Sequence, residues 1–123
     1  MKITTSSRKA GFTLVEIMIV VAIIGMLAAI AIPNFVKARN TAQANACIAN
    51  MSQIDGAIQQ WALEKGKKDS EAVAPLEVAE YIKGRKMPKC PQGDDYNFGA
   101  NLSASPVVSC PNQETSTPKH LLQ

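Results

Sequence analysis

Hydrophobic side chains fill an almost unbroken stretch near the start of the chain. From Phe12 to Ile32 the sequence reads FTLVEIMIVVAIIGMLAAIAI, 21 residues that include one charged side chain, Glu16. About 20 apolar residues in a helix are enough to cross the hydrocarbon core of a bilayer. We therefore predict a transmembrane helix. Because an acidic side chain inside such a span is costly, we expect Glu16 to have a partner and a function.

Beyond this span the apolar residues follow a spacing that marks one face of a helix. They recur every three or four residues: Cys47, Met51, Ile54, Ile58 and Trp61. This spacing is typical of an amphipathic helix whose apolar face packs on a core. We therefore predict one helix from Phe12 to about Lys65, with Pro33 either kinking it or removing one hydrogen bond. Lipid or other helices would surround its first half, and a small domain would cover its second half.

The remaining residues, 66–123, are predicted to form that small domain. A polar loop precedes a short helix from Pro75 to about Lys83. Two short strands, near 95–99 and 107–110, are expected to pair as an antiparallel hairpin against the long helix. The predicted fold class is therefore α+β, with a long N-terminal helix packed on a small C-terminal antiparallel β-region.

A short basic segment without acidic residues precedes the span and contains Lys2, Arg8 and Lys9. The whole chain has 13 Lys and Arg against ten Asp and Glu, so these three residues account for the formal net charge of +3. Positive charge before an apolar span is a signal for membrane topology. It does not indicate a nucleic-acid-binding surface, and we expect no direct binding of nucleic acid.

The junction between the basic segment and the span has a recognisable pattern. Residues 9–16 read KAGFTLVE, and the pattern continues without a gap through Gly25 and Pro33. This run closely resembles the processing site of the type IV pilin superfamily, which includes the pseudopilins of type II secretion. The resemblance implies that a prepilin peptidase and methyltransferase cuts between Gly11 and Phe12 and then methylates the new N-terminus at Phe12.

The same resemblance implies a division of the chain and a function. The segments would be a leader (1–11), a transmembrane and assembly helix (12–33), an amphipathic helix (34–65) and a small C-terminal domain (66–123). The chain would be a filament subunit that is stored in the inner membrane with its C-terminal domain outside the cytoplasm. Its partners would be copies of itself and minor pilins. Filaments of this superfamily serve secretion, motility, adhesion or DNA uptake.

Within this interpretation Glu16, Gly25 and Pro33 are assigned to assembly. Phe12 and Glu16 are four residues apart and therefore share one helix face. A buried amine and a buried carboxylate offset part of each other's cost when they pair. If the Phe12 amine of one subunit meets Glu16 of the next, the pair sets the axial register of the filament. Alternatively, Glu16 extends toward the membrane surface or pairs with the amine of its own chain.

Two other functions fit the same pattern of residues. One is a single-pass anchored binding domain that lies outside the cytoplasm and never polymerises. The other is a small secreted domain released by a signal peptidase, since Ala29-Ile30-Ala31 has the A-x-A form of a cleavage site. The position of Glu16 and the continuation of the helical pattern past Ala31 argue against the second of these.

Three cysteines allow one disulfide, and a domain outside the cytoplasm can hold one. Cys90 and Cys110 flank the predicted hairpin, and a bridge between them would stabilise the domain by about 3 kcal/mol in the chain-entropy model. Cys47 lies on the apolar helix face and is expected to be a buried thiol. No metal site is expected, because the chain has no C-x-x-C pair and His120 lies in a polar tail that is expected to be loose.

No catalytic site or cofactor is expected, and we predict that the chain is not an enzyme. His120 is the one histidine of the sequence and lies near the end of a polar tail, so the sequence shows no catalytic triad based on histidine. The neighbouring carboxylates of Asp94 and Asp95 suit a turn better than an acid–base pair. By resemblance to some pseudopilins, these two residues could contribute to a calcium-binding loop.

Overall fold

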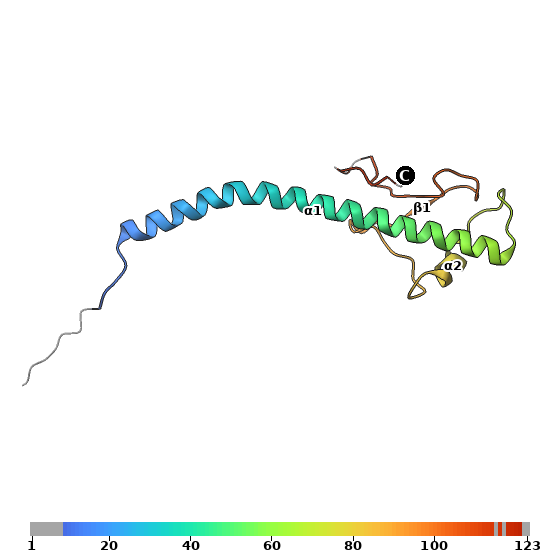
Figure 1. The fold of residues 1–123 in the computed structure, drawn as a ribbon, viewed down its shortest axis with the longest axis horizontal. Helices are drawn as coiled ribbons and strands as arrows, with labels where there is room; N and C mark the ends of the chain where they lie inside the picture. The colour runs from blue at the N-terminus through green and yellow to red at the C-terminus, as the bar shows by residue number, and fades with distance from the viewer. Residues whose placement is uncertain (1–8, 115, 117, 122–123) are drawn as a thin grey trace, which may run out of the picture. The chain divides into compact units, whose positions relative to one another are not determined.

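The computed structural model describes residues 9–114, 116 and 118–121. Lys2 and Arg8 of the predicted leader lie outside these described residues. Contacts within the chain divide it into two compact units, Met1–Val36 and Lys37–Gln123. The elements in chain order are α1 (Leu14–Lys65), α2 (Pro75–Val78), the 3-10 helix η1 (Ala79–Tyr81), β1 (Asn97–Phe98) and β2 (Val108–Ser109) (Figure 1). The predicted α+β class, a long apolar N-terminal helix and a small antiparallel sheet, is confirmed.

The first unit contains the N-terminal part of α1. The helix begins at Leu14, two residues later than predicted, and continues through Pro33 as one element. Its large apolar side chains between Leu14 and Val36 are all exposed. By length and composition the helix is able to cross a membrane, as its sequence predicted. Pro33 lacks a backbone N–H, so it removes one helical hydrogen bond without ending the helix.

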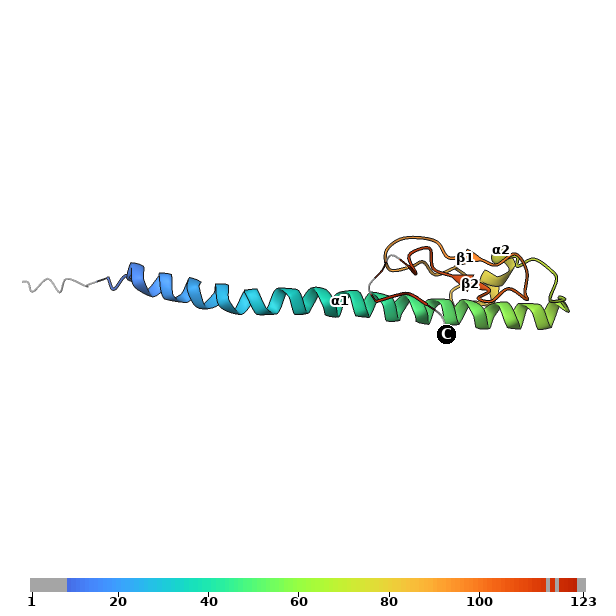
Figure 2. The ribbon, with the colours of Figure 1, turned by 90° about the horizontal axis from the view of Figure 1, so that it is seen from above.

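The second unit forms its core along one face of α1. All five residues of the predicted stripe are buried, together with one alanine before the stripe and one within it: Ala44, Cys47, Met51, Ile54, Ala57, Ile58 and Trp61. Figure 2 shows α2, β1 and β2 along one side of this part of the helix. The amphipathic pattern therefore correctly predicted which helix face the small domain covers.

The short helix after the loop is shorter than predicted. It begins at Pro75, in the first helical position, and α2 gives way to η1, which ends at Tyr81. Val78 and Ile82 are buried in the core beside α1. The indole Nε1 of Trp61 donates a hydrogen bond of 2.8 Å to Glu77 Oε2, which joins this short helix to the long one.

The predicted hairpin is present as an antiparallel pair of two-residue strands. Phe98 lies opposite Val108, and the backbone N–H of Gly99 extends the pairing with a bond of 2.7 Å to the carbonyl of Val107. A Cβ atom on Gly99 would overlap the Cβ of Ala104, so any other residue there would force the connection between the strands to shift. Both strands are shorter than the sequence predicted.

The C-terminal tail differs from the prediction of a loose segment. The side chain of His120 is only 1% exposed. The hydroxyl of Ser116 also contacts Gln92 Oε1 at 3.3 Å, so the tail packs against the loop that follows Cys90. The expectation of a loose tail is therefore wrong for these residues, because long-range packing, which local polarity does not reveal, holds them in place.

Candidate functional site

The start of α1 is held by reciprocal hydrogen bonds between Thr13 and Glu16. The backbone N–H of Thr13 donates to Glu16 Oε2 at 2.8 Å, and its hydroxyl contacts the same oxygen at 3.0 Å. The backbone N–H of Glu16 in turn donates to the Thr13 hydroxyl oxygen at 3.2 Å. A threonine before the first helical residue and a glutamate three positions later form a capping box, which satisfies free N–H groups at a helix start.

The hydrophobic pattern alone does not predict this capping box, although its signal is present in the sequence. The four letters TLVE match the S/T-x-x-E pattern of a capping box. We expected the carboxylate of Glu16 to extend outward or to pair with an amine. Within the single chain its hydrogen-bond donors are instead the N–H and hydroxyl of Thr13.

The predicted cleavage junction lies just before this capping box. Residues 9–13 are in an irregular segment, and Phe12 is 87% exposed. Apart from the chain neighbours and, at Gly25, the backbone of the same helix turns, no described atom lies within 4 Å of where a Cβ on Gly11 or Gly25 would stand. The structure therefore places Gly11, Phe12 and Glu16 together at the exposed start of the helix, whereas Gly25 and Pro33 lie further along it. The roles assigned to these five residues stay predictions.

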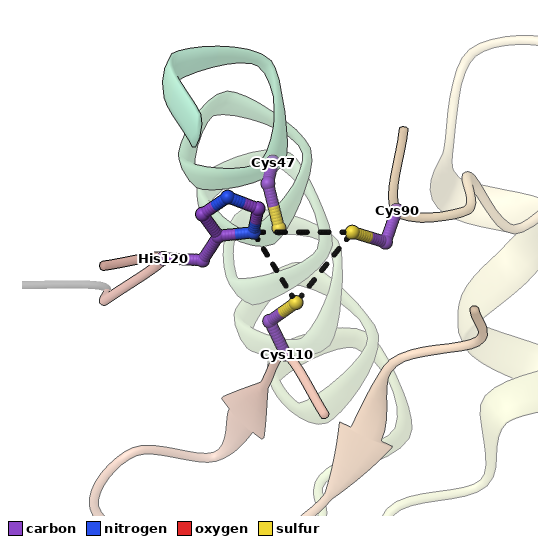
Figure 3. Close-up of side chains that lie close together, drawn as sticks. All are labelled: Cys47, Cys90, Cys110 and His120. Atoms are coloured by element: carbon purple, nitrogen blue, oxygen red, sulfur yellow. Dashed lines mark hydrogen bonds between the residues drawn. The ribbon is translucent and has the colours of Figure 1, made fainter. Parts of the chain in front are cut away.

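A second group of chemically reactive side chains lies in the core of the second unit. It consists of Cys47, Cys90, Cys110 and His120, which we call the thiol–imidazole cluster (Figure 3). The three Sγ atoms and one imidazole nitrogen all lie within 4.8 Å of one another. His120 Nδ1 is 3.6 Å from the Sγ of Cys110 and 4.0 Å from that of Cys90. All four side chains are buried, with at most 2% of any of these residues exposed.

Four separate segments bring these side chains together. Cys47 comes from the apolar face of α1, and Cys110 follows directly after β2. Cys90 begins a tight turn in which its carbonyl accepts a bond of 2.7 Å from the N–H of Gly93. His120 comes from the tail. No local motif indicates this cluster, because its members are separated by 43, 20 and 10 residues along the chain.

Burial governs the electrostatics of the cluster. Removal from water raises the pKa of the Cys47 thiol to about 12, although a hydrogen bond from the hydroxyl of Tyr96 acts in the opposite direction. Burial also raises the pKa of Cys110. These two thiols are therefore neutral at physiological pH as long as no positive charge joins them.

The expected disulfide between Cys90 and Cys110 stays a prediction. Both cysteines are free thiols in the structure, and their Sγ atoms are 3.6 Å apart. A disulfide bond is about 2.05 Å long, so the two sulfurs are neighbours without being bonded. Cys47 is a buried thiol, as its position on the helix face predicted.

The two carboxylates considered for calcium binding have other partners. Asp94 Oδ2 accepts a hydrogen bond from the side-chain amide of Asn112. Asp95 Oδ1 is 3.1 Å from Lys89 Nζ in an exposed ion pair. Both contacts tie the turn after Cys90 to its surroundings, and a calcium-binding role for the pair stays a prediction.

The comparisons with known proteins comprise one match to a short N-terminal motif and several matches to longer stretches of the chain. Residues 6–32 match the model of the prokaryotic N-terminal methylation motif. The chain is 47% identical to the type IV major pilin protein PilA of Myxococcus xanthus over 83% of this chain, and it spans 58% of the length of that protein. It is 29% identical to type II secretion system core protein G of Klebsiella pneumoniae over 74% of each chain.

A further relative aligns over a shorter range. The fimbrial protein of Pseudomonas aeruginosa is 43% identical over 55% of this chain and 44% of its own length. No solved structure matches the chain. Gly11, Phe12, Glu16 and Gly25 all lie within the residues matched by the methylation motif.

Proposed function

We propose that this chain, which carries the N-terminal methylation motif and is similar to a type IV major pilin and to type II secretion core proteins, is a structural subunit of a pilus-like or pseudopilus filament. The observation that carries the proposal is that motif, joined to an apolar helix whose side chains stay exposed in the described chain. An apolar surface of this extent needs lipid or protein around it. Before assembly the membrane surrounds this surface with lipid, and in a filament other copies of the chain surround it with protein.

Before assembly the chain is an inner-membrane protein with its C-terminal domain outside the cytoplasm. Lys2, Arg8 and Lys9 precede the apolar span, which supports an orientation with the leader on the cytoplasmic side. The prepilin peptidase and methyltransferase is then the first partner. Exposure at Phe12 and the absence of a side chain at Gly11 leave the bond between them accessible to such an enzyme.

In the filament, the partners are other copies of the chain and minor pilins. Cleavage after Gly11 leaves Thr13 in the mature chain, so the capping box with Glu16 survives. The new amine of one subunit then meets a carboxylate that Thr13 already orients in the next. Two opposite charges in an apolar environment favour one axial position over its neighbours, because any other position leaves both unpaired. This function requires no catalytic group and no cofactor.

The two alternatives predict different locations for the chain. An anchored binding domain would stay in the membrane fraction. A domain released after Ala31 would be soluble and would begin at Ile32. The second alternative cuts α1 in the middle of a continuous helix, about halfway between its start and the buried stripe.

The experiment compares cells that make the chain with and without the prepilin peptidase. Filaments are sheared from the cells, membranes are collected, and the N-terminus of the chain in each fraction is identified by mass spectrometry. We expect methylated Phe12 as the first residue in the filament fraction, and the full leader in membranes of cells without the peptidase. A chain that starts at methylated Phe12 but occurs only in membranes would overturn the filament function and favour the anchored domain.

A further inference from the structure

We propose that the thiol–imidazole cluster is a structural zinc site, in which Cys47, Cys90, Cys110 and His120 bind one Zn²⁺ ion. The ligands would be three thiolate sulfurs and the Nδ1 atom of the imidazole. This role is separate from the proposed assembly function of the N-terminal part of α1, which belongs to the other unit of the chain.

The distances between the four atoms fit tetrahedral coordination. Zinc lies about 2.3 Å from thiolate sulfur and about 2.0 to 2.1 Å from histidine nitrogen, so neighbouring ligand atoms are roughly 3.5 to 3.8 Å apart in a tetrahedron. The contact between Cys90 Sγ and Cys110 Sγ is 3.6 Å. Those from His120 Nδ1 are 3.6 and 4.0 Å, and all pairs lie within 4.8 Å. Small rotations of these side chains would bring every pair into range.

The chemistry of the ligands favours zinc over other common cations. Three sulfurs and one imidazole nitrogen form a Cys₃His set, which is typical of structural zinc sites. Calcium and magnesium prefer carboxylate and carbonyl oxygens, and the cluster offers no carboxylate. Figure 3 shows the four side chains converging from different sides on one space. Because all four are buried, the site is closed, as structural rather than catalytic zinc sites are.

The architecture of the second unit explains what the metal would contribute. Beyond α1, its regular structure consists of two very short helices and two strands of two residues each in the described chain. Small domains with little regular structure commonly need a disulfide or a metal to become stable. The cluster joins α1, the turn at Cys90, the end of β2 and the tail. One zinc ion would therefore fix four segments that few backbone hydrogen bonds connect.

Zinc binding and the disulfide predicted from the sequence exclude each other. A bond between Cys90 and Cys110 would consume two of the four ligands. Binding zinc instead displaces one proton from each of the three thiols and leaves the imidazole neutral, so the complex carries one net negative charge. The state of Cys90 and Cys110 therefore distinguishes the two possibilities directly.

The test uses the full-length chain, purified in detergent micelles without added chelator or reductant. Zinc is measured by elemental mass spectrometry, and cysteines are alkylated without reduction and mapped by peptide mass. We expect one zinc per chain and no linkage between cysteines. A chain that contains a Cys90–Cys110 disulfide and no zinc would overturn the proposal, as would three free thiols without zinc after incubation with zinc chloride.

A second measurement identifies the ligands. Cobalt(II) replaces zinc in such sites and gives visible absorption bands that report tetrahedral sulfur coordination. We expect these bands in the native chain and at least tenfold weaker cobalt and zinc binding by His120→Ala and Cys47→Ala. Tyr96→Phe is the matched control, because its hydroxyl lies 3.5 Å from Cys47 Sγ but is not a proposed ligand. Undiminished binding by both ligand variants would contradict the assignment.

If a ligand variant fails to fold, the native chain still decides the question. Removing zinc with a strong chelator should lower the unfolding temperature of the C-terminal domain, and adding zinc back under reducing conditions should restore it. An unfolding temperature that does not respond to removal and return of the metal would contradict a structural role.

Discussion

The side chains of Thr13 and Glu16 hold each other at the first turn of α1, with a distance of 3.0 Å between the Thr13 hydroxyl and Glu16 Oε2. This contact gives the one acidic residue of the apolar span a local partner before any filament forms. It also places negative charge at the positive end of the helix dipole, where such charge is favourable. The glutamate therefore caps its own helix, and in the proposed filament it would also receive an amine from another subunit.

The first prediction separates the capping role from the filament. Thr13→Ala removes the hydroxyl but leaves the carboxylate of Glu16, so the helix start should lose about 1 kcal/mol. We expect mature filaments to form with yield reduced by less than tenfold. The measurement is the ratio of chain in sheared filaments to chain in membranes, and Thr13→Ser, which keeps the hydroxyl, serves as control. Complete loss of filaments in Thr13→Ala with normal filaments in Thr13→Ser would mean that the cap itself is essential for assembly.

The second prediction concerns processing. In Gly11→Val, a branched side chain stands beside the bond that the peptidase would cut. We expect the precursor to accumulate in membranes and the mature form to fall at least tenfold. Immunoblotting resolves the two sizes, and Gly25→Ala, a substitution outside the junction, should be cut normally. A Gly11→Val chain that appears at mature size with Phe12 at its N-terminus would refute the proposed cleavage.

The third prediction tests the link between the long and the short helix. Trp61→Phe keeps an aromatic ring in the core but removes the N–H that donates to Glu77 and leaves space beside it. We expect the C-terminal domain to lose about 2 kcal/mol of unfolding free energy. Urea unfolding of the full chain in mild detergent, followed by circular dichroism, measures this. Glu77→Gln keeps an acceptor on an exposed side chain and should cost less than about 1 kcal/mol.

A result that reverses this order would have a clear meaning. If Glu77→Gln destabilised the domain more than Trp61→Phe, the charge of Glu77 would matter more than the packing of the indole.

Periodicity predicted the long helix and its buried face well, because each turn of a helix repeats the same environment. The stripe from Cys47 to Trp61 carries that repetition, and all its members are buried. The capping box was also readable, since its two residues are only three positions apart. These features depend on local sequence alone.

The thiol–imidazole cluster, in contrast, depends on contacts between residues that are far apart in the sequence. Cys47 and His120 are 73 residues apart, and no local pattern in the polar tail indicates that His120 is buried. The same holds for the short strands, whose extent is set by how the turn and the tail pack around them. Long-range packing therefore determines the structure of the C-terminal domain beyond α1, which composition and residue spacing predict poorly.

The last prediction concerns Glu16 and the proposed register of the filament. Glu16→Gln keeps the size of the side chain and an oxygen that can accept hydrogen bonds from Thr13, but it removes the negative charge. In an isolated membrane helix this change should be neutral or slightly favourable, because a buried amide costs less than a buried carboxylate. Membrane insertion and cleavage after Gly11 should therefore stay largely intact.

In a filament the same change should be harmful, because the amine of the incoming Phe12 loses its counter-charge. Removing one partner of a buried ion pair typically costs about 3 to 5 kcal/mol, which lowers an assembly equilibrium by two or more powers of ten. We expect Glu16→Gln to be processed normally and to be nearly absent from sheared filaments, while Thr13→Ala, which keeps the charge, still assembles. Glu16→Asp, with a shorter charged side chain, should give an intermediate yield. A normal filament yield from Glu16→Gln would show that Glu16 does not set the register, and the proposed mechanism of assembly would be wrong.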